Sequence, residues 1–425
     1  MRLINISEDQ FNQKTAHLPC LNWHETKEWA KLKSHTGWHS HFLLYINDND
    51  EVTAGVMLLD KNIPMSKKKL FYAPRGPLID FDNLELLKAF HNDLIKYIKT
   101  NDGFELLIDP YLEYQHRDMN GDIIDDGFSR QDVVDTLIKL GYHHNNGFNL
   151  YNENLQPRWL YRLSLKGRTF DEIFKKFKTE NRRLYKKKDF YAITVRELKR
   201  NEINKYKDVM AHTASRRGFI DRPLKYYEDM YDAMHESRML RYFVAEINFE
   251  KAISNFNEDI NKSLAKLERL RSRSNQNTKT QNEIREEEIR YNSLLKNLEI
   301  IKGYAAKSDN ITVLSGITLL NYGNEAVMLL AGNYEDYELF SSSVILVSEL
   351  IKISVEEGQD YYNFYGITGD FDESNPLNGL YTFKKGFGGE VMELIGEFEY
   401  VIDPLSKSFY EMGLKVYNLL KKIRH

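Results

Sequence analysis

Short apolar runs alternate with amphipathic stretches along most of the chain. Residues 42–46, 52–59 and 104–109 have the apolar and aromatic content of strands, and residues 84–100 have the period of a helix. The same order returns in the second half, where we predict strands at 240–246, 311–320, 326–332 and 361–367 and a helix at 341–357. The two halves look like one plan used twice, and the pattern alone predicts an α+β fold.

Between about residues 246 and 302 the pattern changes. Apolar positions there step by three and four and then, after the polar stretch 272–278, recur every seven residues. These positions are Ile253, Phe256, Ile260, Leu264 and Leu267, with Arg271 continuing the spacing, followed by Ile284, Tyr291 and Leu298. The spacing predicts an antiparallel coiled-coil hairpin whose single apolar stripe makes it project into solvent. A spacer or a dimerisation arm is its simplest role.

Residues 175–188 hold eight cations and one acid. The segment follows Thr169 and Glu172, which have the spacing of a capped helix start. We therefore predict one basic helix, with its cations facing phosphates or simply solvent. The expected packing positions are Ile173, Phe174, Phe177, Leu184 and Tyr185.

The composition is that of a globular protein with 42% hydrophobic residues and a net charge of −4 over 425 residues. That length allows two or three domains with real cores. No run of about 18 uncharged apolar residues occurs, and the first residues lack an apolar core, so we expect a cytoplasmic protein. The lone Cys20 fits a reducing compartment.

Near its end the chain combines an aromatic run, 361–367, with a second aromatic segment at 379–388. Lys384 stands in that segment among Tyr381, Phe383 and Phe387. A lysine held among apolar rings keeps its charge only near an anion, so the segment predicts a pocket wall. The alternative is an edge strand followed by a solvated lysine.

Five segments together resemble the Fem family, the transfer-RNA-dependent aminoacyltransferases that build side-chain cross-bridges on peptidoglycan precursors. They occur in the family's order and span nearly the whole chain, and the third and fifth lean towards the FemA and FemB branch. The segments are His24–Lys33 with Gly37 and Trp38, Tyr72–Asp80, Leu106–Leu112, Arg217–Tyr227, and the tail 361–388.

The resemblance implies a tandem pair of acetyltransferase-like (GNAT-like) domains. The first would hold residues 1–155, with a contribution from about 396–425, and the second 156–395. The helical hairpin at 246–302 would be inserted in the second domain, where an RNA contact is one role that the resemblance allows.

The resemblance also implies the chemistry, in which an amine at the end of a stem peptide attacks the ester of an aminoacyl-tRNA. Because the ester is already activated, no nucleotide hydrolysis is needed. The chain has no Gly-rich loop ending in Gly-Lys-Ser/Thr, no His-Glu-x-x-His and no Cys-x-x-Cys. We therefore expect no metal and no cofactor, with aminoacyl-tRNA as co-substrate.

Site residues follow from the matched positions. The resemblance implies that Lys384 contacts the tRNA end and stabilises the oxyanion of the transition state, and that Phe383 lies beside the acceptor. It implies that Lys33, Arg222 and Tyr226 bind the phosphates of the precursor. Asp109, at a strand end before Pro110, has two readings, as a base for the acceptor amine or as a turn residue.

We thus expect an aminoacyltransferase acting on a lipid-linked precursor at the inner face of the membrane, with glycine or serine as the amino acid. One alternative is a non-catalytic RNA-binding or scaffold protein with a coiled-coil arm. A coenzyme A-dependent N-acetyltransferase is the other, although the chain lacks a Gln/Arg-x-x-Gly-x-Gly/Ala loop for the pyrophosphate.

Overall fold

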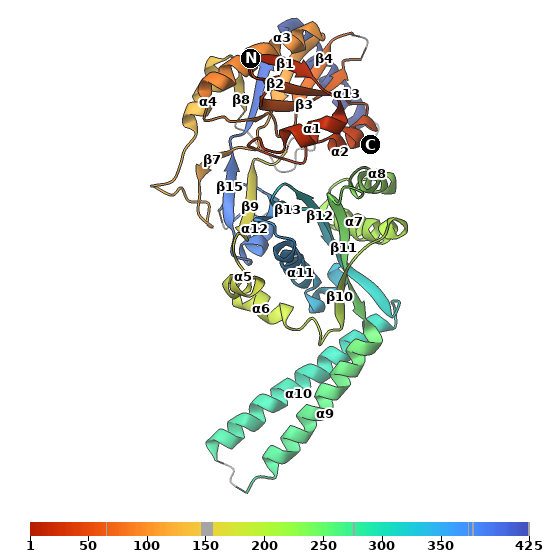
Figure 1. Cartoon of the computed structure of the whole chain (residues 1–425). Helices are drawn as coiled ribbons and strands as arrows, with labels where there is room; N and C mark the ends of the chain where they lie inside the picture. Colours follow the sequence, from red (N-terminus) through yellow and green to blue (C-terminus); the bar gives the residue numbers. More distant parts are fainter. Residues whose placement is uncertain (65, 146–155, 275–276, 373, 376–377, 424–425) are drawn as a thin grey trace.

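The computed structural model describes residues 1–425 except 65, 146–155, 275–276, 373, 376–377 and 424–425, and it leaves the side chains of 417–423 undescribed. Two mixed sheets, each eight-stranded in the described residues, lie one beyond the other, and a long helical hairpin extends from the second (Figure 1). None of the helices described is both long enough and apolar enough to cross a bilayer.

The first sheet is covered by helices on both faces. One face packs against α3 (Leu84–Thr100) and α4 (Gln131–Lys139), and the other against α1 (Glu8–Thr15) and α2 (Lys27–Ser34). The strand order is β1 (Arg2–Asn5), β2 (His39–Ile46), β3 (Val52–Asn62), β4 (Lys69–Ala73), β6 (Gly103–Ile108), β16 (Glu397–Val401) and β8 (His143–Asn145), with β5 (Leu78–Ile79) paired to β3.

The second sheet has the same layered plan. On one face lie α5 (Phe170–Lys176), α6 (Thr179–Tyr185), α11 (Ser342–Glu356) and α12 (Asn378–Lys385), and on the other α7 (Ile203–Arg217) and α8 (Leu224–Met234). Its strand order is β10 (Ile193–Glu197), β11 (Leu240–Asn248), β12 (Ile311–Tyr322), β13 (Glu325–Asn333), β14 (Tyr361–Ile367), β9 (Trp159–Ser164), β15 (Glu390–Leu394) and β7 (Glu113–His116). The short 3₁₀ helices η1 (Arg200–Glu202) and η2 (Glu335–Phe340) lie between these elements in the sequence.

The two sheets exchange strands and share a core. β7 comes between strands of the first sheet in the sequence but pairs in the second, while β16 returns to the first sheet and is followed by α13 (Pro404–Ile423). One hydrophobic cluster joins Trp29 of α2 with Tyr227 of α8 and Tyr242 of β11. This shared core fixes α2 against α8 across the boundary between the sheets.

The hairpin consists of α9 (Phe249–Arg271) and α10 (Thr278–Ala305), which run side by side away from the sheets (Figure 1). The predicted seam is right at Phe256, Ile260 and Leu267 but wrong at Leu264, whose side chain is 40% exposed. Ser263 is buried there instead, because steps of three and four fit two overlapping stripes and only the partner helix selects one.

The single basic helix predicted across 175–188 is also wrong, because two short helices, α5 and α6, replace it. The Thr169–Glu172 capping box forms as predicted. The break falls at Phe177, which has extended backbone and buries its ring against Phe387 at 5.1 Å between centroids. Core packing of one phenylalanine thus outweighs the helical propensity of the surrounding lysines and arginines.

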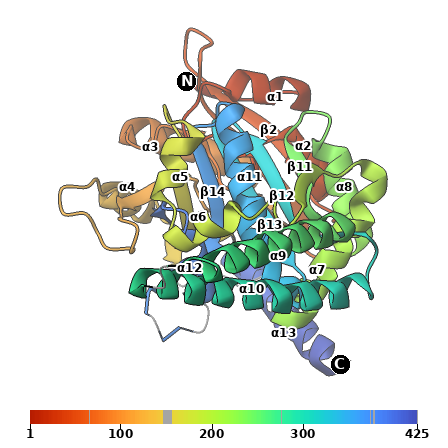
Figure 2. The same cartoon turned by 90° about the horizontal axis from the view of Figure 1, so that it is seen from below.

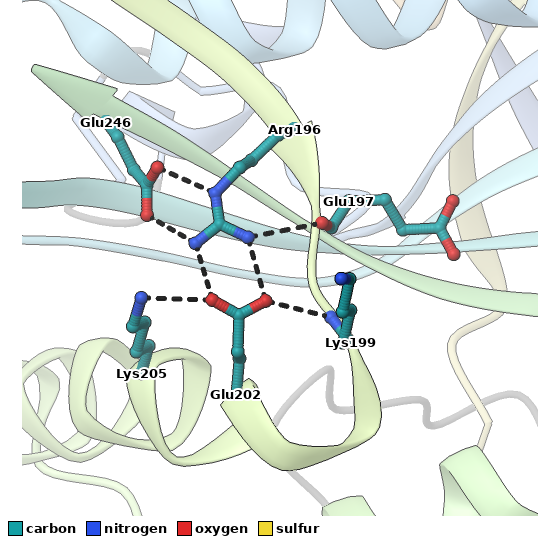
Figure 3. A network of polar contacts seen from close by, with 6 residues as sticks. All are labelled: Arg196, Glu197, Lys199, Glu202, Lys205 and Glu246. Carbon is teal, nitrogen blue, oxygen red and sulfur yellow. Dashed lines mark hydrogen bonds and ion pairs between the residues drawn. The ribbon is translucent and has the colours of Figure 1, made fainter.

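A polar network ties together β10, β11 and the start of α7 at the base of the hairpin (Figure 3). Arg196 donates to Glu246 at 2.7 and 2.8 Å and to Glu202 at 2.8 and 2.9 Å. The Arg196 guanidinium and the Lys205 ammonium hold the pKa of Glu202 at about 2. Glu246 is buried in β11, so its charge depends on this arginine.

Replacing that arginine tests how much the network contributes. Arg196→Met leaves the Glu246 carboxylate buried without its guanidinium partner, and we expect a loss of about 2 kcal/mol in the free energy of unfolding. Urea titrations followed by circular dichroism measure it. Lys262→Met, which breaks an exposed pair with Glu258 on α9, is the control and should leave the midpoint nearly unchanged. Equal effects of the two substitutions would contradict the assignment.

Candidate functional site

Lys384 is buried at the end of α12, with 3% of its surface exposed. Its ammonium donates to the main-chain oxygens of Gly366 at 2.6 Å and Tyr365 at 3.2 Å. The ion pairs among the described residues do not include it. Burial therefore lowers the pKa of the Lys384 ammonium to about 7. The burial of this lysine was predicted correctly. The alternative of an edge strand followed by a solvated lysine is wrong, because β14 pairs with β13 on one side and β9 on the other and Lys384 is buried.

The two oxygens that hold the ammonium come from an irregular turn in β14. Pairing with β9 shifts register between Asn363 and Gly366, and Tyr365 has a φ of 64°, in the left-handed region. The side-chain oxygen of Asn363 accepts the Tyr365 amide at 2.7 Å, which offsets part of the cost of that conformation. The bulge turns the two carbonyl groups towards Lys384.

A buried polar network holds Asn363 in turn. Its amide donates to Glu325 at 3.3 Å and to the Tyr111 hydroxyl at 3.1 Å, and Tyr111 donates to Glu325 at 2.7 Å. Burial raises the pKa of the Glu325 carboxyl, against the opposing effect of these bonds. The parallel pairing of β13 with β14 runs from Glu325–Tyr361 to Val327–Asn363, so the strands separate beside the bulge.

Sequence reasoning did not single out Asn363, Glu325 or Tyr111. Tyr111 and Asn363 lie in two of the segments that resemble the family, and an asparagine inside an aromatic strand is a further signal, because an unpaired amide would be costly there.

Phe383 precedes Lys384 on α12 and is half-buried, with its ring 5.4 Å from that of Phe387. The ring packs against the core cluster of the second sheet. Tyr362 and Phe364, which alternate along β14, are fully buried in the same cluster.

Asp109 lies at the end of β6 with 1% of its surface exposed. One carboxylate oxygen accepts the Arg75 amide at 2.7 Å, and the other accepts the Tyr72 hydroxyl at 3.1 Å. Burial raises the pKa of Asp109, and the Arg75 guanidinium opposes the shift. These contacts hold the loop after β4, in which Arg75 has a positive φ of 63°.

Lys33, Arg222 and Tyr226 come together where α2 packs on α8. The Arg222 guanidinium lies 5.6 Å from the centre of the Tyr226 ring. Burial lowers the pKa of Lys33 to about 8, helped by the nearby charges of Arg222 and Lys61. Sequence reasoning missed Lys61, which lies over Trp38. Among the described residues, Lys33, Lys61 and Arg222 have no carboxylate within ion-pair distance, so the cluster suits an anion.

Tyr365 connects the two groups of predicted residues. Its main-chain oxygen accepts a hydrogen bond from the Lys384 ammonium, while its ring packs in the cluster that contains Tyr226. Burial raises the pKa of its hydroxyl to about 12, and the charges of Arg75 and Asp109 act on the same hydroxyl in opposite directions. The fold thus places Lys384 on one side of Tyr365, and Asp109 with the loop after β4 on the other; this loop is called the Asp109 loop below.

His39 and His41 share a carboxylate partner that lies on the neighbouring strand. His41 lies 2.6 Å and His39 3.2 Å from Asp60, a buried residue that also accepts from Lys69 at 3.1 Å. His41 and Lys69 hold the pKa of Asp60 at about 2 against the effect of burial. Because lysine occupies the carboxylate, the group is a structural ion cluster.

The model of the FemAB family matches residues 6–415. The chain belongs to the FemAB family. Among the relatives of this FemAB chain, aminoacyltransferase FemA of Staphylococcus aureus strain bovine RF122 / ET3-1 is 30% identical over 433 residues, covering 100% of the chain and 99% of the relative. FemA of strain MRSA252 is 30% identical over 430 residues, with the same coverage.

A crystal structure of FemX has the same fold. It superposes with a TM-score of 0.77 at 24% identity, covering 96% of this FemAB chain and 100% of FemX.

Because the pKa of Lys384 is lowered in the folded protein, unfolding takes up a proton between about pH 7 and the ordinary lysine value of about 10.4. The penalty for burying the charged form is therefore present below pH 7 and disappears as the pH rises. We expect the stability of the wild type relative to Lys384→Met to increase from pH 7 to 9, by up to about 1.4 kcal/mol per pH unit. Urea unfolding at each pH measures the difference.

Lys385→Met is the matched control on the same helix, since its ammonium contacts Asn120 at the surface. This variant should keep the wild-type dependence on pH. Parallel profiles for the wild type and Lys384→Met would show that the ammonium titrates normally in the fold.

Proposed function

We propose that this FemAB chain is an aminoacyltransferase that moves glycine or serine from aminoacyl-tRNA to a lipid-linked peptidoglycan precursor. The acceptor is the stem-peptide side-chain amine or the growing bridge. The observation that carries the proposal is the buried Lys384 ammonium, which faces two carbonyl oxygens instead of a carboxylate. Such an ammonium can turn to a developing oxyanion without first breaking an ion pair.

The site residues divide the work between chemistry and binding. Lys384 stabilises the oxyanion and contacts the tRNA end, and Phe383 lies beside the acceptor. Asp109 either takes a proton from the acceptor amine or only holds the loop that contains Arg75 in place. Its bonds to the Arg75 amide and the Tyr72 hydroxyl favour the second role. No cofactor enters, because the aminoacyl ester supplies the driving force.

The cationic group on α2 and α8 binds the precursor's pyrophosphate. Lys33 and Arg222 supply charge, Tyr226 supplies a hydroxyl and a ring, and Lys61 completes the group. Within the described residues no carboxylate pairs with these cations, which supports this role, because a phosphate need not displace a carboxylate.

The tRNA has two candidate contacts outside the site. Exposed cations of α5, α6 and their flanks would attract its backbone, namely Lys175, Lys176, Lys178, Arg183 and Lys186. The hairpin, as a coiled-coil arm, is the second. We also propose that 1–155 with 396–425 and 156–395 are two acetyltransferase-like domains, and that the protein works in the cytoplasm in peripheral contact with the membrane.

A transfer assay tests the function directly. Glycine and serine, radiolabelled and charged on their tRNAs, are offered to lipid-linked precursors that carry no, one or three bridge residues. We expect transfer by the wild type and by Lys385→Ala, and a fall of at least about 100-fold for Lys384→Ala, because an oxyanion donor is lost. Transfer by Lys384→Ala at the wild-type rate would remove the lysine from the mechanism. Salt-sensitive tRNA binding without transfer would favour the RNA-binding alternative.

Anion binding at Lys33 should take up protons. At pH 8 the free side chain is about half protonated, since its pKa is about 8, and a bound anion raises that pKa. We expect inorganic pyrophosphate to bind with uptake of up to about half a proton, seen as different binding enthalpies in two buffers of unequal ionisation enthalpy. Lys33→Arg keeps the charge but does not titrate, so it should show only the proton exchange of pyrophosphate itself. The same proton exchange for the wild type and Lys33→Arg would contradict the phosphate role.

A further inference from the structure

The last helix, α13 (Pro404–Ile423), exposes a stripe of large apolar side chains. Leu405 is 75% exposed, Phe409 67%, Met412 56% and Val416 53%. Their spacing of four, three and four residues places them on one face of the helix. Single exposed apolar residues are ordinary on a protein surface, but four in register along one helix form a continuous apolar surface.

The opposite face attaches the first turns of α13 to the first sheet, whereas residues 411–416 are exposed on every side. Lys407 pairs with Glu105 of β6 at 3.0 Å and also with Glu399 of β16, and the Tyr410 ring lies 5.5 Å from that of Phe104. Because these contacts anchor the side of the helix away from the stripe, the apolar side chains point outward. Figure 2 shows the end of α13 extending past the other elements.

The charges of this segment are strongly one-sided. Residues 404–425 contain one acid, Glu411, and five cations, which are Lys407, Lys415, Lys421, Lys422 and Arg424, although the whole chain has a net charge of −4. An apolar stripe with an excess of lysine and arginine is typical of a helix that lies in the surface of an anionic membrane. Two copies of such a helix would bring like charges together, so the charge favours a lipid surface over a second copy.

We propose that α13 is an interfacial helix that docks this protein on an anionic lipid surface. Leu405, Phe409, Met412 and Val416 enter the apolar boundary, and the excess of lysine and arginine in the segment attracts the anionic lipid. The benefit for catalysis rests on the proposed function, because a lipid-linked acceptor lies in that surface, whereas the docking itself does not.

Sedimentation with vesicles tests the docking. The full chain is mixed with vesicles of phosphatidylcholine alone or with 30% phosphatidylglycerol, a composition of about physiological charge. We expect the wild type to bind the anionic vesicles, less tightly as salt rises, and the double variant Phe409→Glu/Met412→Glu to bind at least about tenfold more weakly. Ile289→Glu, at a 63% exposed position on α10, is the control for an added surface charge and should bind like the wild type.

Two outcomes would overturn the proposal. One is equal binding by the wild type and the double variant, or no binding by either. The other is a wild-type dimer in light scattering that the double variant converts to a monomer without any vesicle binding, which would assign the stripe to a second copy.

Transfer to two acceptors separates docking from the proposed function. The double variant should match the wild type with a water-soluble precursor that lacks the lipid tail, and fall well below it with the vesicle-embedded form. If the wild type transfers to neither acceptor, the proposed function fails, while sedimentation still decides whether α13 docks.

Discussion

The ammonium of Lys384 donates to two main-chain oxygens inside a shell of aromatic rings, and much of the second sheet is built to permit this contact. Main-chain oxygens of a regular strand are used by the neighbouring strands. Here the bulge at Tyr365 frees two of them, Asn363 holds the bulge, and Glu325 with Tyr111 holds Asn363. Each of these residues thus forms a hydrogen bond that a buried polar group of the one before it needs.

The same arrangement explains why a destabilising feature sits in the core. Burying an ammonium lowers its pKa and costs stability, as does a non-glycine residue with positive φ. Such costs are typical of sites where a charge is held ready for a reaction instead of being neutralised. In the FemAB chain this charge lies one tyrosine away from the Asp109 loop.

The second constraint is the core shared between the sheets. Trp29 and Tyr227 pack in one cluster, so α2 and α8 meet along a fixed line and bring Lys33 to Arg222. If that cluster were only loosely packed, mutual repulsion would separate these cations. Apolar packing therefore offsets the repulsion between the cations and keeps the anion site together.

Local patterns in the sequence determined the elements whose formation depends on neighbours in the chain. The helix at 84–100 was predicted at the residues where α3 begins and ends, and the capping box at Thr169 and the projecting hairpin were also predicted, because apolar period and capping act within a few residues. Family motifs led to the FemAB assignment, which the match over residues 6–415 confirms.

Tertiary structure decided what depends on a distant partner. The break at Phe177 needs Phe387, the choice of Ser263 over Leu264 needs α10, and the Asp60 cluster needs three strands side by side. The bulge at Tyr365 needs Glu325 and Tyr111, which lie 40 and more than 200 residues away in the chain. No local period encodes such contacts, since their energy comes from burial and hydrogen bonds that exist only after the chain has folded.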